Sequence, residues 1–359
     1  MGTSGRTAAS PSRLAASVLA AALLLAPLPA QAQQAELAAY TKAVDSFRAI
    51  LKERRAQLAA KQKLPNLPGQ ALYLARNAVI SAYKDLTDAQ PSRIGRPNRY
   101  SIPPAYFDAA NEPLLDEYAA IFAVMQAPPA NAQPSPTPFE DVVVLGTAIA
   151  RARGLDTASA AIAGRVSLGM FFAETNGNQN IGNARSNRYK GSLQTGVEED
   201  RKGAKKWAAI RDKVRALDPT VIARDDREQA RVGAGDQRYN HWTAVRNGLM
   251  NAHAEVFVQI PAIVKMVPDP IDQMKVFELI QIVPTPTRSA IRSGNIATYR
   301  VSEPRIMAFL RNNSMFTFGR SDRARTSANY REIIAAMWLF NEKFERALAR
   351  YEEIRAKRR

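Results

Sequence analysis

Apolar residues recur at three- and four-residue steps along most of the chain, and this spacing restricts the fold more than any other feature. The steps are clearest at Leu37, Tyr40, Val44, Phe47, Leu51 and Leu58, and again at Ile334, Met337, Phe340, Phe344, Leu348 and Tyr351. They place apolar side chains along one face of an α-helix, whereas a half-buried strand needs a two-residue alternation. Segments with that alternation are few, so the sequence predicts an all-α fold.

Turn-forming residues divide this pattern into separate helices. Residues 126–138 are rich in Pro, Ala, Asn and Ser and indicate a linker or an exposed loop. Asp156 or Thr157 is suited to cap the helix that follows. Five prolines between residues 260 and 300 predict irregular backbone there, with one short helix. The expected helices are residues 34–62, 70–86, 103–125, 139–153, 157–174, 199–217, 236–257, 271–280, 301–310 and 327–354.

Residues 1–32 are typical of a secretory signal peptide. Arg6 and Arg13 precede an apolar stretch over residues 14–25, and Ala30-Gln31-Ala32 provides a cleavage site of the A-x-A type. The apolar stretch is too short to span a bilayer core of about 30 Å. No later run is apolar enough to do so either. The sequence therefore predicts export, with the periplasm as the expected compartment and no integral membrane anchor.

Positive charge is concentrated in the second half of the chain. The whole sequence has 50 Lys and Arg against 33 Asp and Glu, and residues 151–359 account for 36 and 22 of these. A strongly positive surface attracts polyanions. For an exported protein these are glycan strands of peptidoglycan, or another anionic polymer of the cell envelope, and nucleic acid is not an expected partner. The basic tail over residues 355–359 is consistent with solubility alone, and the oligomeric state stays open.

The composition argues against metal and thiol chemistry. The chain has no Cys and only two His. His241 and His253 are twelve residues apart, about 120° around an α-helix, so they do not share a face. Phosphate-binding and nucleophile-elbow glycine motifs do not occur. We therefore expect no metal site and no cofactor, and look to carboxylates, hydroxyls and amides for any chemistry.

Glu174 is the strongest candidate for a catalytic group. It lies in the last turn of an expected helix, two residues after Phe172 and two before an Asn176-Gly177 turn, with Phe171 also nearby. The negative end of the helix dipole and burial beside aromatic rings would both raise the pKa of its carboxyl. A carboxyl that keeps its proton can act as the general acid on a glycosidic oxygen. The alternative is an ordinary, fully exposed glutamate before a helix C-cap.

A second motif follows about twenty residues later. Tyr189-Lys190-Gly191-Ser192-Leu193-Gln194 comes after an Asn- and Gly-rich turn. Together with Glu174-Thr175, it resembles the active-site region of lytic transglycosylases and other lysozyme-like muramidases. That family has Glu-Ser at a helix end and a Gly-Leu-Met-Gln loop, so Ser192 and Leu193 depart from its pattern. Its third motif, Ala-Tyr-Asn, is matched by Tyr239-Asn240 with Arg238 in place of Ala.

The resemblance implies roles for individual residues. Glu174 would be the catalytic acid and base, and the Tyr of the third motif would contact it. Amides and hydroxyls can both donate to and accept from sugar hydroxyls, and tyrosine rings offer flat faces to pyranose rings. The residues expected to bind substrate or to orient the carboxyl are Thr175, Asn178, Tyr189, Ser192, Gln194, Tyr239 and Asn240.

The resemblance also implies an organisation and a reaction. A lysozyme-like catalytic core is expected over residues 151–260, with helical regions over 33–150 and 261–359 around it. A lytic transglycosylase needs one carboxylate, because a hydroxyl of the sugar closes an anhydro ring. Glu198, Glu199 or Asp200 would supply the second carboxylate of an inverting hydrolase. The alternative to an enzyme is a non-catalytic periplasmic protein that binds glycan or acts as a scaffold, on a degenerate lysozyme-like core.

Overall fold

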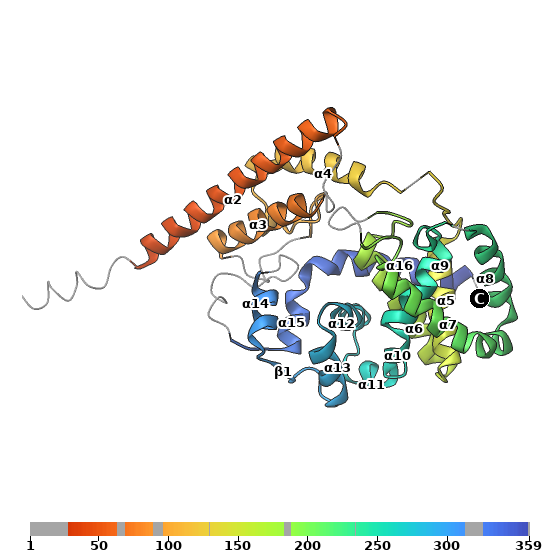
Figure 1. Cartoon of the computed structure of the whole chain (residues 1–359). Helices are drawn as coiled ribbons and strands as arrows, with labels where there is room; N and C mark the ends of the chain where they lie inside the picture. Colours follow the sequence, from red (N-terminus) through yellow and green to blue (C-terminus); the bar gives the residue numbers. More distant parts are fainter. Residues whose placement is uncertain are drawn as a thin grey trace, which may run out of the picture.

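The protein is all-α, as the spacing of apolar residues predicts (Figure 1). The computed structural model describes residues 28–62, 69–88, 96–128, 130–182, 188–233, 235–312 and 326–357. Helices make up 75% of it and strands 3%. None of the helices in these ranges is long and apolar enough to cross a membrane. Most of the predicted signal peptide, residues 1–27, and the end of the basic tail lie outside the described residues.

The first helices form a separate layer with a hydrophobic core of their own. Side chains from α2, α3 and α4, among them Tyr40, Phe47, Leu72 and Ile121, are buried against one another. Figure 1 shows these helices to one side of the rest of the chain. The layer consists of α2 (Leu28–Ala59), α3 (Gln70–Thr87), the 3-10 turns Pro104–Tyr106 and Ala109–Asn111, and α4 (Glu112–Gln126).

The remaining helices share a second, larger core. They are α5 (Pro138–Ala152), α6 (Thr157–Thr175), α7 (Val197–Leu217), α8 (Pro219–Val232), α9 (His241–Ala252), α10 (Ala254–Phe257), α11 (Ile260–Met266), α12 (Pro270–Ile282), α13 (Pro284–Arg292), α14 (Pro304–Asn312), α15 (Tyr330–Ala336) and α16 (Asn341–Lys357). Short strands β1 (Arg300–Val301) and β2 (Ala328–Asn329) pair antiparallel beside them. Because α5 packs on α6, and α12 and α16 pack on α6 as well, the divisions expected at residues 150 and 260 both fall within this core.

Several helix boundaries differ from the sequence prediction. Helix α8 was not predicted, and residues 260–300 hold three helices in place of one. Pro270 and Pro284 are the first residues of α12 and α13, because a helix's first turn needs no intrahelical N–H and accepts proline. The helices expected over 236–257 and 327–354 are each broken, near His253 and Met337.

Helix α6 is buried along most of its length and around its whole circumference. Asp156 caps it, since the Asp156 side chain accepts a hydrogen bond from the Ser159 N–H at 2.9 Å, as the sequence indicated. Glycines allow the neighbouring helices to approach closely. A Cβ at Gly169 would lie 2.7 Å from Met274 Cγ on α12, and one at Gly164 would lie 2.9 Å from the Val143 carbonyl oxygen on α5.

A buried aspartate joins α7, α8 and α9. Asp225 of α8 accepts hydrogen bonds from the indole N–H of Trp207 on α7 and of Trp242 on α9, each at 2.9 Å. Arg246 on α9 donates to it at 2.7 Å, and both charged side chains are almost fully buried. A buried charge is stable only with partners of this kind. Trp207 and Trp242 therefore belong to the packing of the main core.

We expect Asp225→Ala to lower the free energy of unfolding by about 3–5 kcal/mol, because it leaves a buried guanidinium and two indole donors without their acceptor. The matched control is Asp226→Ala, which removes an exposed carboxylate paired with Arg211 and should cost less than about 1 kcal/mol. Urea denaturation of both variants measures the difference. Equal losses in the two variants would contradict the structural role of Asp225.

Candidate functional site

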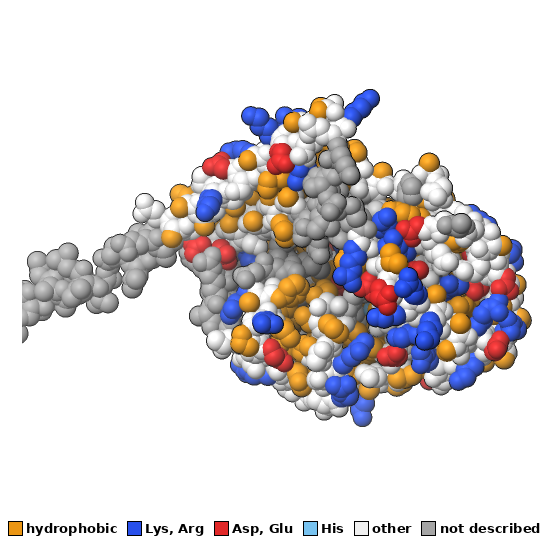
Figure 2. All heavy atoms as spheres, viewed as in Figure 1, with side chains coloured by type: hydrophobic (Ala, Val, Ile, Leu, Met, Phe, Trp, Pro, Cys, Tyr) orange, Lys and Arg blue, Asp and Glu red, His pale blue; other side chains and the backbone are white. Residues whose placement is uncertain are grey.

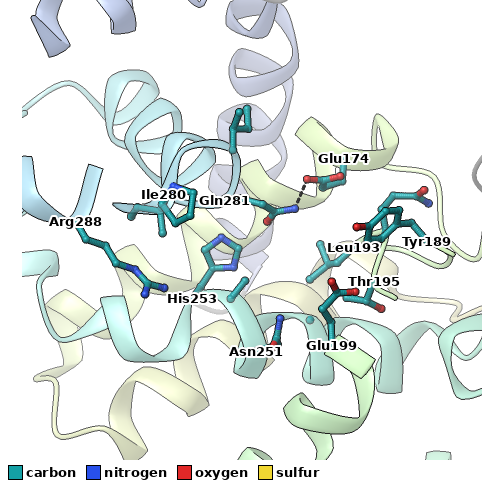
Figure 3. A pocket seen from close by; sticks show the side chains of 15 residues that line it. Glu174, Tyr189, Leu193, Thr195, Glu199, Asn251, His253, Ile280, Gln281 and Arg288 are labelled. Atoms are coloured by element: carbon teal, nitrogen blue, oxygen red, sulfur yellow. Dashed lines mark hydrogen bonds between the residues drawn. The ribbon is translucent and has the colours of Figure 1, made fainter. Parts of the chain in front are cut away.

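The C-terminal end of α6 opens into a cleft of about 620 Å³ (Figure 3). Its walls come from α6, the segment 189–199, the end of α9, and the junction of α12 with α13. The main polar groups in its lining are Glu174, Tyr189, Gln194, Glu199, Asn251, His253, Gln281 and Arg288. Apolar side chains such as Leu193 and Ile280 complete it. The cleft brings the predicted catalytic carboxyl of Glu174 together with two other predicted residues, Tyr189 and Gln194.

Glu174 lies in the wall of this cleft and is half-buried. Helix α6 ends directly after it, because Asn176 adopts the left-handed conformation with a φ of 57° and caps the helix. The side-chain amide of Gln281 on α12 donates a hydrogen bond to Glu174 Oε1 (Figure 3). The Glu174 side chain is therefore half-buried and fixed by Gln281, unlike the fully exposed glutamate of the alternative interpretation.

The segment 188–196 folds into a tight turn that forms another wall. Lys190 and Thr195 bond each other's backbones at 3.1 and 3.0 Å. Gly191, with a φ of 78°, lies against the chain at Arg238, where a Cβ would be 2.1 Å from the carbonyl oxygen. Gln194 lines the cleft, and its amide donates to the Gly191 carbonyl oxygen at 2.8 Å. The glycine of the second motif is thus required by close packing.

Three residues that were predicted to bind substrate are buried and have structural contacts instead. Thr175 donates to the Phe171 carbonyl oxygen at 2.9 Å. Ser192 Oγ is 2.7 Å from Nδ1 of His241, and the side chain of Asn240 caps α9 by accepting from the Thr243 N–H. None of the three is part of the cleft lining. Their hydroxyl and amide groups hold the elements around the cleft in place.

Two further candidates lie near the cleft without lining it. Asn178 is exposed and donates to the Thr175 carbonyl oxygen at 3.0 Å, which closes the turn after α6. Tyr239 is half-buried, with Lys190 Nζ 5.3 Å from the centre of its ring. It belongs to a 3-10 turn before α9 and is not among the residues that form the cleft. Of the predicted set, Glu174, Tyr189 and Gln194 share the cleft.

A second carboxyl and a lysine lie close to Glu174. Glu278 on α12 is buried, and its Oε2 has no hydrogen-bond partner in the part of the chain that the structure describes. Burial raises the pKa of Glu278, the negative charge of Glu174 raises it further, and Lys343 lowers it. Lys343 on α16 donates to the Ala173 carbonyl oxygen at 2.8 Å. Glu174 therefore has as its neighbour a carboxyl whose pKa is raised mainly by burial.

Sequence reasoning missed Gln281, Glu278 and Lys343, which meet Glu174 from far along the chain. It also missed the cleft residues His253 and Arg288. Gln281 and Arg288 lie where the backbone was expected to be irregular, whereas Glu278, Lys343 and His253 lie in expected helices whose packing against α6 the sequence does not reveal. Only the fold brings these positions together.

Comparison with known proteins and a search for metal-binding clusters both give negative results. No protein-family model, curated protein or solved structure matches this chain. Within the described ranges, His, Asp and Glu side chains form no group of three suited to a metal ion. Any function therefore has to be argued from the geometry of the cleft itself.

We expect Glu278→Gln to gain stability relative to wild type as the pH rises from about 5 to 8. A carboxyl whose folded-state pKa is raised stabilises the fold below its unfolded-state pKa, and that contribution is lost as the pH rises towards the folded value. The gain should reach at most about 1.4 kcal/mol per pH unit. Denaturation at several pH values measures it. Glu353→Gln, an exposed control on α16, should show no such trend.

Proposed function

We propose that this protein is an exported enzyme that cleaves the glycan of peptidoglycan, as a lytic transglycosylase with Glu174 as its acid and base. The observation that carries the proposal is that Glu174, Tyr189 and Gln194 line one cleft. These three come from the two motifs that resemble the lytic transglycosylases. Export to the periplasm rests on the signal-peptide pattern of residues 1–32, and a lysozyme-like core rests on the same motifs.

In the proposed reaction, Glu174 first gives a proton to the glycosidic oxygen of the bond that breaks. A hydroxyl of the same sugar then attacks the anomeric carbon and closes an anhydro ring. Glu174, now a carboxylate, takes the proton of that hydroxyl, so the carboxyl returns to its starting state. Gln281 is placed to orient Glu174 through its hydrogen bond to Oε1. Burial raises the pKa of Glu278, which disfavours a second negative charge beside Glu174.

The lining of the cleft supports a sugar ligand. Tyr189 offers an aromatic face, while Gln194 and Asn251 carry amides that can serve both kinds of sugar hydroxyl contact. Lys and Arg side chains are spread over the main body on the face that Figure 2 shows, which favours an anionic polymer as partner. Peptidoglycan combines both properties, since its sugars carry acidic substituents.

A hydrolase is the nearest alternative reaction. Glu199 lines the same cleft and is the one acid of the group 198–200 that does so. One of its carboxylate oxygens accepts a hydrogen bond from the Gly196 N–H, and the other is 3.3 Å from Arg188. These contacts secure the first turn of α7, so Glu199 would have to leave them to activate a water molecule.

The test is digestion of purified peptidoglycan by the chain from residue 33 onwards, beside Glu174→Gln, with mass spectrometry of the released products. We expect anhydro-ended muropeptides from the wild type and a rate lower by about 10²–10⁴-fold for Glu174→Gln, the usual effect of losing a general acid. Glu353→Gln is the control for a carboxylate removed from an exposed site, and it should digest at the wild-type rate.

The other outcomes separate the alternatives. Products with reducing ends would show hydrolysis and direct attention to Glu199 as the second carboxylate. Binding to peptidoglycan without release of any product would favour the non-catalytic binding or scaffold protein. Equal release by wild type and Glu174→Gln would exclude Glu174 as the acid.

A further inference from the structure

The end of the cleft away from Glu174 contains a histidine that has no hydrogen-bond partner among the described residues. His253 follows α9, is 1% exposed and lines the cleft. Neither of its ring nitrogens makes a hydrogen bond of normal geometry within the described residues. A buried polar group left in this way destabilises the fold, and proteins seldom keep one without a use. The two nitrogens are therefore buried and without a partner in a wall of the cleft.

The imidazole of His253 is neutral at neutral pH. Burial lowers its pKa to about 4, and the positive charge of Arg288 acts in the same direction. The backbone of Phe277 lies near the ring and opposes both effects, without the alignment of a hydrogen bond. A neutral imidazole has one donor and one acceptor. His253 thus offers hydrogen bonds to a ligand but no charge.

Arg288 supplies the charge at this end of the cleft. It lies on α13, is half-buried, and its Nε has no hydrogen-bond partner among the residues that the structure describes. The charge of Arg288 acts weakly on Glu255, whose carboxylate is 2.9 Å from Lys206 Nζ and owes its lowered pKa mainly to that lysine. Figure 3 shows Arg288 and His253 on the same side of the cleft, with Gln281 between them and Glu174.

The charge balance of the lining favours one kind of anion. Among the described residues that line the cleft, Arg288 is the one cation, and Glu174 and Glu199 are the acids. Helix α13 begins with Pro284 and has a second proline at Pro286, so its first turn offers few N–H groups to a phosphate. A single guanidinium forms two parallel hydrogen bonds with a carboxylate and balances its one negative charge.

We propose that Arg288 and His253 form a subsite for a carboxylate-bearing group of the ligand. Arg288 binds the carboxylate, and His253, once its ring turns toward the ligand, bonds a neighbouring hydroxyl or amide of the same sugar unit. This inference rests on the proposed function in one respect, namely that the ligand in the cleft is a glycan. It adds that the cleft selects acidic sugars over neutral ones, through residues outside the motif region.

The test measures binding in the Glu174→Gln background, where the ligand is not consumed. The two probes are a tetrasaccharide of alternating N-acetylglucosamine and N-acetylmuramic acid, and the tetramer of N-acetylglucosamine, which lacks the carboxylates. We expect calorimetry to show tighter binding of the acidic probe. Adding Arg288→Gln should weaken that binding by about tenfold or more and leave the neutral probe unchanged. Arg292→Gln, an exposed arginine on the same helix, is the control and should change neither.

A second variant keeps the result independent of folding. Arg288→Lys retains the charge but loses the two-pronged geometry, so it should bind the acidic probe with an affinity between those of the other two proteins. Equal binding of the two probes, or equal weakening of both by Arg288→Gln, would overturn the subsite and leave the proposed function standing. Failure of both probes to bind would count against the glycan cleft and the subsite together.

Discussion

The burial of α6 is the constraint on which the candidate site depends. This helix has no polar face, because α5, α12 and α16 cover it on different sides. A carboxylate in the middle of such a helix is costly to bury, whereas one in the last turn can reach the surface of the core. Asn176 and Gly177 stop the helix directly after Glu174. The position of Glu174 at the edge of a hydrophobic core follows from that arrangement.

Helix α12 is also largely buried, and it supplies two polar neighbours of Glu174. It too is buried on most sides, yet it carries Glu278 and Gln281, three residues apart and therefore on one face. The face meets the end of α6, where Gln281 bonds Glu174 and the field of Glu174 acts on Glu278. Lys343 from α16 offsets part of the negative charge. Polar groups gather at this one point of the core because each reduces the cost of burying the others.

The sequence predicts the helices better than it predicts the contacts between them. The three- and four-residue spacing gives the all-α fold, and the Asp156 cap and the Asn176 turn give both ends of α6. Prolines misled the prediction for residues 260–300, because a proline that begins a helix looks in sequence like one that breaks it. The motifs led to Glu174, Tyr189 and Gln194. Thr175 and Ser192 carry the same polar groups that a substrate would need, and sequence alone cannot tell that these groups are used inside the fold.

The charge spread over residues 151–359 and the charged residues that line the cleft have different effects. The surplus of Lys and Arg over residues 151–359 acts over a distance on any polyanion and weakens as salt rises. The cleft itself is lined by Glu174, Glu199 and Arg288, so its lining is not part of that surplus. Under the proposed function, surface charge would collect an acidic polymer but would not decide which unit of it enters the cleft. That choice has to come from short-range contacts inside the cleft, where one guanidinium and one neutral imidazole lie opposite a carboxyl.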